Sequence, residues 1–418
     1  MTQFIAPTIA SVGVDNTEET LFERQYPLHG RGMSYNSYAI IDTQIAIMDS
    51  VEAGQGDLWI SNILAATGGR TPDYLVVQHM EPDHSASIMI AAARWPQMKV
   101  VASAKAHQML TRFFPDAQLS PERILTVGEG DTLSLGSHTL QFFTAPMIHW
   151  PEVIVSYETT TATLFSADAF GKFGAISLSR SHPWAEDARR YFINIVGKYG
   201  PSVQTLLKKI STLPAVNTIA PLHGPTLTGS EITEAIRLYK LWSSYTHETP
   251  GVLVAHASIY GGTAEAAHQF AQMLRDGGAP EVVEIDLTEA DQSEAVAQAF
   301  RLSHLVVAAP TYDAAIYPPM HDFLHHLTLK NYRNRHVAII ENGSWAPTAG
   351  RQMRTLLESL PGITIIEPIV TITSRLNADT TAQLHQLATN LLASLPYCMR
   401  LFQAVFLDFA VEGALGDV

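Results

Sequence analysis

Four side chains that bind metal ions or carry protons lie within six residues in the segment QHMEPDHSAS, residues 78–87. They are His79, Glu81, Asp83 and His84. Imidazole and carboxylate groups at this density are typical of a metal site or a proton-transfer site. The alternative is a polar loop that holds two histidines by chance, and the rest of the chain has to decide between these interpretations.

Three further candidate ligands stand alone, each where an apolar segment ends. They are His149 in TAPMIHWPE, Asp168 in LFSADAFG and His223 in IAPLHGP. Singly, each has an ordinary explanation, because an Asp after a strand often caps a turn and a lone His beside Pro or Gly is often a surface residue. An apolar strand, a single ligand and a turn, repeated three times, is the pattern that a metal site between two sheets requires. Together with the first cluster, it favours a metal centre built from seven side chains.

The segments around these residues predict strands that alternate with turns before residue 250. They are rich in β-branched or aromatic residues and are bounded by Gly, Pro, Asp and Asn: SYAIIDTQIAIMD, DYLVVQH, MKVVAS, RILTVGEGDTLSLGSHTLQFFTAP, VIVSYE, TATLFSAD and NTIAPLH. Helices are predicted at AEDARRYFINIVGKYG and SVQTLLKKI. The pattern indicates two β-sheets with helices outside, and ligands in loops at the carboxyl ends of strands. The segment THETP, residues 246–250, is predicted to be a linker that ends in a helix-stopping proline.

A regular alternation of strands and helices follows residue 250. The predicted strands are GVLVAHA, EVVEID, HLVVAAP, HVAIIE and ITIIEPIV, separated by helices such as TAEAAHQFAQMLRDGG and AGRQMRTLLESL. This rhythm predicts a doubly wound parallel sheet of flavodoxin type. We therefore expect an α/β protein with one domain at residues 1–249, a second at 250–395 and an apolar tail at 396–418, whose role is not evident.

Composition limits the partners and the compartment. The chain has 418 residues, of which 46% are hydrophobic and 16% charged, as in soluble globular proteins. The net charge of −14 argues against nucleic acid or an anionic membrane as a partner. A single cysteine excludes an intramolecular disulfide, and no secretory signal is evident, so a cytoplasmic protein is expected.

The combined pattern resembles the flavodiiron proteins, also called A-type flavoproteins, over about residues 20–395. The HxExDH cluster with His149, Asp168 and His223 is similar to the metal signature of the metallo-β-lactamase fold, with Glu81 where the zinc version has a second His. The segment HGRGMSYNSYAIID is also similar to a His-Gly and Tyr-Asn-x-Tyr segment of the family. The resemblance implies an N-terminal αββα sandwich of metallo-β-lactamase type and a C-terminal flavodoxin-like domain that binds FMN.

The resemblance also implies how the ligands divide between two iron ions. One iron is expected at His79, Glu81 and His149, the other at Asp83, His84 and His223, with Asp168 as the bridge between them. Four imidazoles and three carboxylates suit non-haem iron, and the carboxylates offset three of the four charges of a diferrous pair. Zinc in the same site, as in a hydrolase of this fold, is the alternative, but zinc has no redox chemistry that would use a flavin domain.

Three loops at strand ends resemble the flavin-binding loops of flavodoxin-like domains. The first opens a helix, where backbone N–H groups and the helix dipole suit a phosphate. The second is similar to the family's Pro-Thr loop beside the flavin ring, and the third to the loop whose Trp flanks the ring. Pro347 and Thr348 replace two glycines of the family pattern in the third loop, and Asn342 stands where Ser is usual. The candidate FMN residues are Ser258, Ile259, Tyr260, Gly261, Gly262 and Thr263, then Pro310, Thr311, Tyr312 and Asp313, then Asn342, Gly343, Ser344, Trp345 and Ala346.

The activity that the resemblance implies is reduction of dioxygen to water, of nitric oxide to nitrous oxide, or of both. With one cysteine the chain has no CxxC pair, so we expect a separate electron donor, such as a rubredoxin or a flavin reductase. The family also implies a head-to-tail homodimer, or a dimer of dimers. Two alternatives remain open: a di-zinc hydrolase fused to a flavodoxin-like domain, and an FMN electron carrier with an inactive metal domain. His29 and Trp150 are candidates for proton delivery or for packing beside the irons.

Overall fold

The computed structural model describes residues 3–116, 119–179 and 181–395, so the predicted tail at 396–418 lies outside the described residues. The chain divides into two compact units, residues 1–244 and 245–418. The predicted linker at THETP is correct for residues 246–248 but not for its last two residues. Helix α8 (Ser230–Ser243) ends before it, and strand β18 (Thr249–His256) already includes Pro250. A proline near the start of a strand is tolerated, because few ladder hydrogen bonds need its missing N–H.

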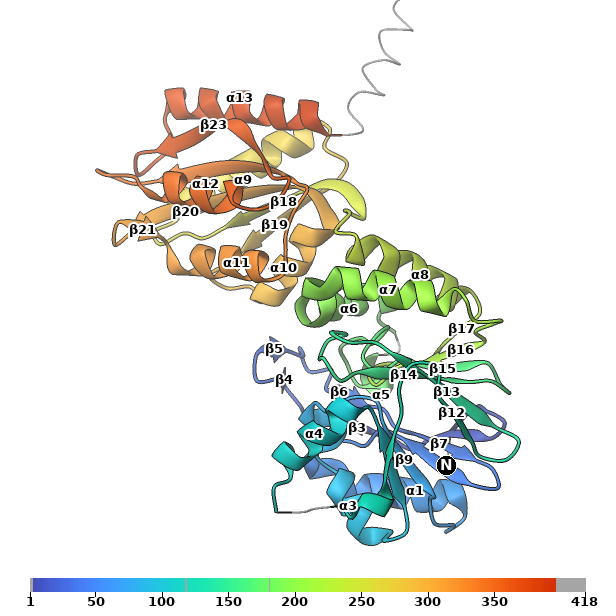
Figure 1. Ribbon diagram of the computed structural model, residues 1–418. Helices are drawn as coiled ribbons and strands as arrows, with labels where there is room; N and C mark the ends of the chain where they lie inside the picture. Colours follow the sequence, from blue (N-terminus) through green and yellow to red (C-terminus); the bar gives the residue numbers. More distant parts are fainter. Residues whose placement is uncertain (1–2, 117–118, 180, 396–418) are drawn as a thin grey trace, which may run out of the picture. The chain divides into compact units, whose positions relative to one another are not determined.

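The first unit is built on two sheets (Figure 1). The seven-stranded sheet has the order β1 (Gln3–Ala6), β2 (Ile9–Ser11), β7 (Tyr38–Ile41), β8 (Ile45–Met48), β9 (Tyr74–Val77), β10 (Lys99–Ala102) and β11 (Ile124–Thr126). The six-stranded sheet has the order β12 (Thr132–Ser134), β13 (Thr139–Thr144), β14 (Ile154–Glu158), β15 (Thr163–Phe165), β16 (Thr218–Ala220) and β17 (Leu227–Thr228). Two short pairs, β3 (Val14–Asn16) with β6 (Met33–Tyr35) and β4 (Leu21–Phe22) with β5 (Tyr26–Pro27), complete the strands of this unit.

The two sheets bury a common core between them. Ile40 and Val76 of the first sheet pack in one cluster with Phe142 and Phe165 of the second, all fully buried. Helices α1 (Gly56–Thr67), α3 (Ile88–Arg94) and α4 (Ala104–Phe113) lie beside the first sheet, and α6 (Trp184–Tyr191), α7 (Gly200–Ile210) and α8 beside the second. The predicted helix AEDARRYFINIVGKYG is α6 continued by a π-helical turn, Phe192–Val196, and a 3₁₀ turn, Gly197–Tyr199. This is the predicted αββα sandwich.

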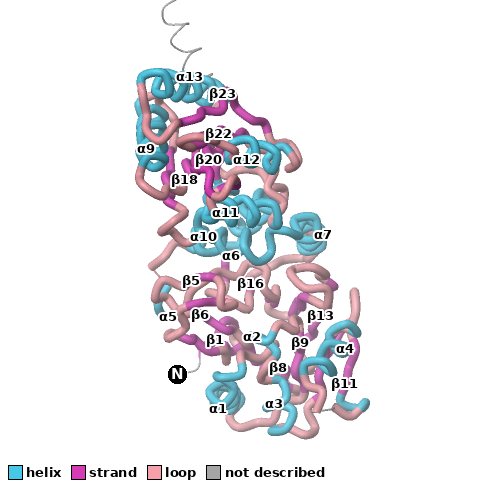
Figure 2. Tube along the Cα trace, turned by 90° about the vertical axis from the view of Figure 1, so that its left-hand side faces the viewer, coloured by secondary structure: helices cyan, strands magenta, loops and turns pink. Residues whose placement is uncertain are grey.

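The second unit is a parallel sheet with helices on both faces (Figures 1 and 2). Its strand order is β19 (Val282–Asp286), β18, β20 (Leu302–Tyr312), β22 (His336–Asn342) and β23 (Thr364–Ile372), which is the flavodoxin-type order. Helices α9 (Gly262–Asp276) and α13 (Ala378–Ser394) pack on one face, with Phe270 and Leu387 fully buried. The remaining elements are α10 (Gln292–Arg301), α11 (Pro318–Leu329), α12 (Ala349–Glu358) and the short β21 (Ala315–Ile316) beside β20. The predicted doubly wound sheet is confirmed.

Among the described residues, no helix combines the length and the hydropathy that crossing a bilayer requires.

Candidate metal centre and cofactor pocket

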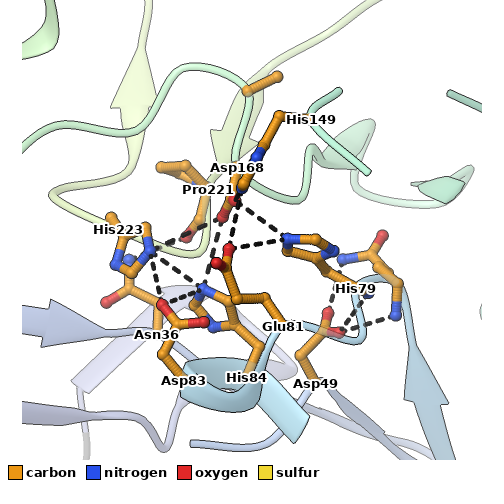
Figure 3. Close-up of polar contacts among 12 residues, drawn as sticks. Asn36, Asp49, His79, Glu81, Asp83, His84, His149, Asp168, Pro221 and His223 are labelled. Carbon is orange, nitrogen blue, oxygen red and sulfur yellow. Dashed lines mark hydrogen bonds and ion pairs between the residues drawn. The ribbon is translucent and has the colours of Figure 1, made fainter. Parts of the chain in front are cut away.

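The loops at the ends of four strands of the first unit bring all seven predicted ligands together (Figure 3). His79 and Glu81 follow β9, and Asp83 and His84 lie in a one-turn helix, α2 (Pro82–Ser85). The remaining three follow β13, β15 and β16 in turn: His149, Asp168 and His223. The turn of α2 explains how four ligands from one short segment can serve two positions, because it aims Asp83 and His84 away from the pair that precedes them.

The ligand atoms form two groups, and within each group they lie within 4.8 Å of one another. The first group is His79, Glu81, His149 and Asp168, and the second is Asp83, His84 and His223. Asp168 faces both groups. Its Oδ2 is 3.4 Å from His79 Nε2 and 3.3 Å from His149 Nε2. Its Oδ1 is 3.4 Å from His84 Nε2 and 3.7 Å from His223 Nε2. A carboxylate in this position can bridge two cations.

The donor set needs positive charge at its centre. Among the described residues, no hydrogen-bond donor reaches the buried carboxylate oxygens of Asp83 and Asp168, which meet only imidazole nitrogens at ion-pair distances. His84 Nε2 and His223 Nε2 are only 3.0 Å apart. Burial opposes protonation of His84, but the carboxylates of Asp83 and Asp168 outweigh burial and raise its pKa to about 10. Protons therefore supply the missing charge when no metal is present, and a metal ion would displace them. The residues fit a pair of metal ions.

Partners outside the ligand set fix which nitrogen of two imidazoles faces the centre. His79 Nδ1 lies 2.8 Å from Glu152 Oε1, and His223 Nδ1 lies 2.7 Å from the Ser34 carbonyl oxygen. Since both partners accept hydrogen bonds, each Nδ1 carries the proton, and each Nε2 presents its lone pair to a metal ion. Asp49 holds the same loop through the backbone, because its Oδ1 accepts from the N–H groups of Gln78 (2.7 Å) and His79 (3.2 Å).

Several residues of the centre were not predicted from the sequence. Glu152 and Asp49 are buried carboxylates that hold His79, and only the position of Glu152 three residues after His149 gave a signal. The Tyr191 ring lies 5.5 Å from the ring of His223, and its buried hydroxyl has no hydrogen-bond partner among the described residues. Of the two residues that the sequence left undecided, the Trp150 ring stands edge-on to His79 at 5.4 Å, whereas His29 is exposed.

The second unit contains a pocket of about 660 Å³ at the carboxyl ends of β18, β20 and β22. All the candidate FMN residues line it except Gly261, and Ala314, Ser374 and Arg375, which were not predicted, line it as well. Tyr260 and Trp345 stand at its rim, and these residues are 92% and 91% exposed. A pocket with flat aromatic groups at its mouth and backbone groups at one end suits a planar ring that carries a phosphate.

The loop at residues 258–263 has the backbone that a phosphate site requires. Gly261 adopts a φ of 87° and is the N-cap of α9, where the first N–H groups have no partner within the helix. At Gly262 a Cβ would lie 2.3 Å from the Ser374 carbonyl oxygen, so no side chain fits there. Ser374 in turn bonds through its N–H to Asn342 Oδ1 (3.0 Å), which ties the segment after β23 to the third loop.

Comparisons with known proteins agree with this architecture. The family model described as ODP family beta lactamase matches residues 33–224. The chain is 29% identical over 321 residues to Diflavin flavoprotein A 1 of Synechocystis sp., covering 75% of this chain and 54% of that protein. It is 27% identical to the anaerobic nitric oxide reductase flavorubredoxin of Aeromonas hydrophila, covering 80% of this chain and 68% of that protein. The chain spans about half the length of the diflavin flavoproteins that it matches.

Solved structures share the whole two-unit fold. The rubredoxin oxygen:oxidoreductase of Desulfovibrio gigas superposes with a TM-score of 0.87 at 23% identity, covering 93% of this chain and 97% of that one. The flavodiiron protein of Giardia intestinalis superposes with a TM-score of 0.86 at 23% identity, covering 94% and 97%. Fold and sequence thus define a metallo-β-lactamase-like domain followed by a flavodoxin-like domain. The predicted resemblance is confirmed, because the relatives and solved structures that this chain is similar to are named as diflavin flavoproteins, flavorubredoxins and flavodiiron proteins.

Proposed function

We propose that this protein is a flavodiiron oxidoreductase that reduces dioxygen to water, nitric oxide to nitrous oxide, or both. The observation that carries the proposal is the convergence of four imidazoles and three buried carboxylates in two groups, with one oxygen of Asp168 facing each group. Two adjacent metal positions suit a small substrate that must receive several electrons at one place. The names of the Aeromonas and Desulfovibrio relatives supply the two candidate gases.

Each side chain has a role that follows from its position. The seven ligands would hold two iron ions, with His79, Glu81 and His149 on one, Asp83, His84 and His223 on the other, and Asp168 between them. When bound, two ferrous ions and a reduced FMN together supply the four electrons that dioxygen requires. The Tyr191 hydroxyl, buried beside His223, can donate a hydrogen bond to a substrate at the centre. Tyr260 and Trp345, at the rim of the pocket, would flank the ring of a bound flavin.

Metal and flavin content tests the proposal directly. We expect about two irons and one FMN in each purified chain; one or two zincs without iron would instead support a di-zinc hydrolase, and FMN without metal an electron carrier. His79→Ala and Asp168→Ala should abolish consumption of both gases while FMN remains bound, because the flavin loops lie in the other unit. His138→Ala is the matched control, since His138 is a buried histidine of the first unit that bonds to Thr8 and not to a ligand. Substantial activity in either ligand variant would contradict the ligand assignment.

The family also supports a partner protein and an assembly. The electron donor is proposed to be a separate rubredoxin or flavin reductase, and the active unit a head-to-tail homodimer in which the flavin of one subunit serves the irons of the other. A two-fold dimer closes this arrangement with two equivalent contacts.

Mixing two inactive chains tests the assembly. One chain carries His79→Ala and the other Gly262→Val, which fills the phosphate loop where no Cβ fits. In a mixed cross-subunit dimer one intact iron site faces one intact flavin, so activity should return. Mixed dimers without activity would show that electrons pass within a chain.

A further inference from the structure

The two groups of the metal centre differ in what holds their imidazoles from behind. In the first group, His79 Nδ1 faces the carboxylate of Glu152 at 2.8 Å. In the second, His223 Nδ1 faces the neutral carbonyl oxygen of Ser34 at 2.7 Å. His84 Nδ1, also in the second group, has no hydrogen-bond partner among the described residues. Among the described residues, an anion therefore accepts a hydrogen bond from the outer nitrogen of His79, and none does so from His84 or His223.

The position of Glu152 is fixed by several contacts. Only 2% of the residue is exposed, and Oε1 accepts from the Met80 N–H at 2.9 Å as well as from His79. The Ser103 hydroxyl donates to the Glu152 carbonyl oxygen at 2.8 Å and holds the loop backbone. Oε2 has no hydrogen-bond partner among the described residues, so the contact with His79 and Met80 is what the carboxylate is placed to make. Without these hydrogen bonds, burial of the carboxylate would lower the stability of the folded protein.

The ligand sets do not create this difference by themselves. Each group has two imidazoles and one carboxylate of its own, Glu81 or Asp83, and each faces one oxygen of Asp168. A carboxylate that accepts the outer N–H of a ligand histidine orients the ring and makes its inner nitrogen more basic. Removal of such a partner typically lowers metal affinity by about 10–100-fold.

We propose that Glu152 is a positioning residue that makes the His79 group the tighter of the two metal sites, so that this group is the last to release its metal ion. This inference depends on the proposed diiron centre. The proposed diiron centre alone predicts no order of metal release, because both groups share Asp168. The contact of Glu152 with His79 adds such an order.

Stepwise removal of iron tests the order. The iron-loaded protein is titrated anaerobically with a ferrous chelator, and the iron retained by each chain is measured. The unmodified protein should lose its two irons in two separate steps, and crystals depleted to one iron should show anomalous scattering at His79 and His149. In Glu152→Gln the second step should shift to a chelator concentration about 10–100-fold lower, while the first step stays in place.

A second buried carboxylate provides the matched control. Glu158 is fully buried in the same unit, and its Oε1 lies 3.0 Å from Nδ1 of His138, which is not a ligand. Glu158→Gln should leave both release steps unchanged. Equal shifts of both steps in Glu152→Gln, or no shift, would overturn the proposal.

The experiment distinguishes a failure of this proposal from a failure of the proposed function. If Glu152→Gln fails to fold, the unmodified protein still tests the proposed order of release. The order would be overturned if the iron that is released last lay at His84 and His223. A protein that never holds two irons would refute the proposed function instead.

Discussion

Asp49 offers a test of how the chain holds the ligand loop without touching the metal. It follows β8, is fully buried and has a φ of 55°. Its Oδ1 accepts the backbone N–H groups of Gln78 and His79, and its Oδ2 accepts the Gln78 side-chain amide at 2.9 Å. Asp49→Ala leaves three buried donors without an acceptor. At about 1.5–3 kcal/mol for each hydrogen bond to a charged group, and with partial relaxation, we expect a loss of about 3–5 kcal/mol in the free energy of unfolding.

Asp49→Asn separates the geometry from the charge. The substituted side chain keeps one carbonyl oxygen for the two backbone donors, and its new amide group would face the amide of Gln78. Gln78 can turn its own amide to accept that group, because its Oε1 has no hydrogen-bond partner among the described residues. We therefore expect a loss of only about 1–1.5 kcal/mol, the scale of one hydrogen bond.

Urea unfolding at pH 8 measures both variants. Burial raises the pKa of Asp49 to about 6, so the carboxylate of the unmodified protein is ionised under these conditions. The iron content of the purified variants is the second readout, and it should fall in Asp49→Ala and persist in Asp49→Asn. Asp57→Ala, which removes an exposed carboxylate on α1, serves as the control. An alanine variant as stable as the control, or equal losses in the alanine and asparagine variants, would refute this account of the loop.

Three further predictions address the pocket, the pH response and the substrate side of the centre. Thr263→Ala should weaken FMN binding by about 1–2 kcal/mol, the scale of a hydrogen bond to a charged group. Thr355→Ala, on the exposed face of α12, is the control and should leave FMN binding unchanged. If fluorescence titration gave equal affinities for the two variants, the phosphate would have to bind elsewhere. Burial and the neighbouring His336 lower the pKa of His304 to about 3, whereas the unfolded chain takes up this proton near pH 6.5, so stability is lost as the pH falls below 6.5. His304→Gln should therefore lose about 2 kcal/mol less than the unmodified protein between pH 7 and pH 5 in urea unfolding, and identical losses would contradict the shift. Tyr191→Phe removes a buried hydroxyl without a hydrogen-bond partner among the described residues, so the free energy of unfolding should change by no more than about 1 kcal/mol. The rate of gas consumption should fall. An unchanged rate would show that Tyr191 does not donate a hydrogen bond to the substrate.

The sequence predicted the parts of the fold that repeat a strong local pattern. The strands before His79, Asp168 and His223 are apolar and end at turn residues, so both the strands and the ligands at their ends were predicted. Strands β1 to β6, of two to four residues each, were not predicted from the sequence. The predicted linker ran two residues too far because Pro250 was taken as a stop, although a proline is compatible with the start of a strand.

The residues around the two sites were harder to predict for a different reason. Asp49 and Ser34 act on ligands 30 and 189 positions away along the chain, and no local pattern records a contact of that separation. Ser374 and Arg375 line the cofactor pocket from the end of β23, where no glycine-rich motif marks the loop. Such contacts follow only from the order of strands in each sheet.

The aromatic rim of the pocket also gives the flavin unit its own optical signal. Of the six tryptophans in the sequence, five lie within residues 1–244, and Trp345 alone lies between residues 245 and 418. The residue is 91% exposed, so its indole should emit at the long wavelengths of an indole in water. A flavin stacked beside it would accept its excitation energy and quench that emission. The difference spectrum between this chain and a Trp345→Phe chain therefore isolates one residue and reports the filling of the pocket, whatever occurs at the irons.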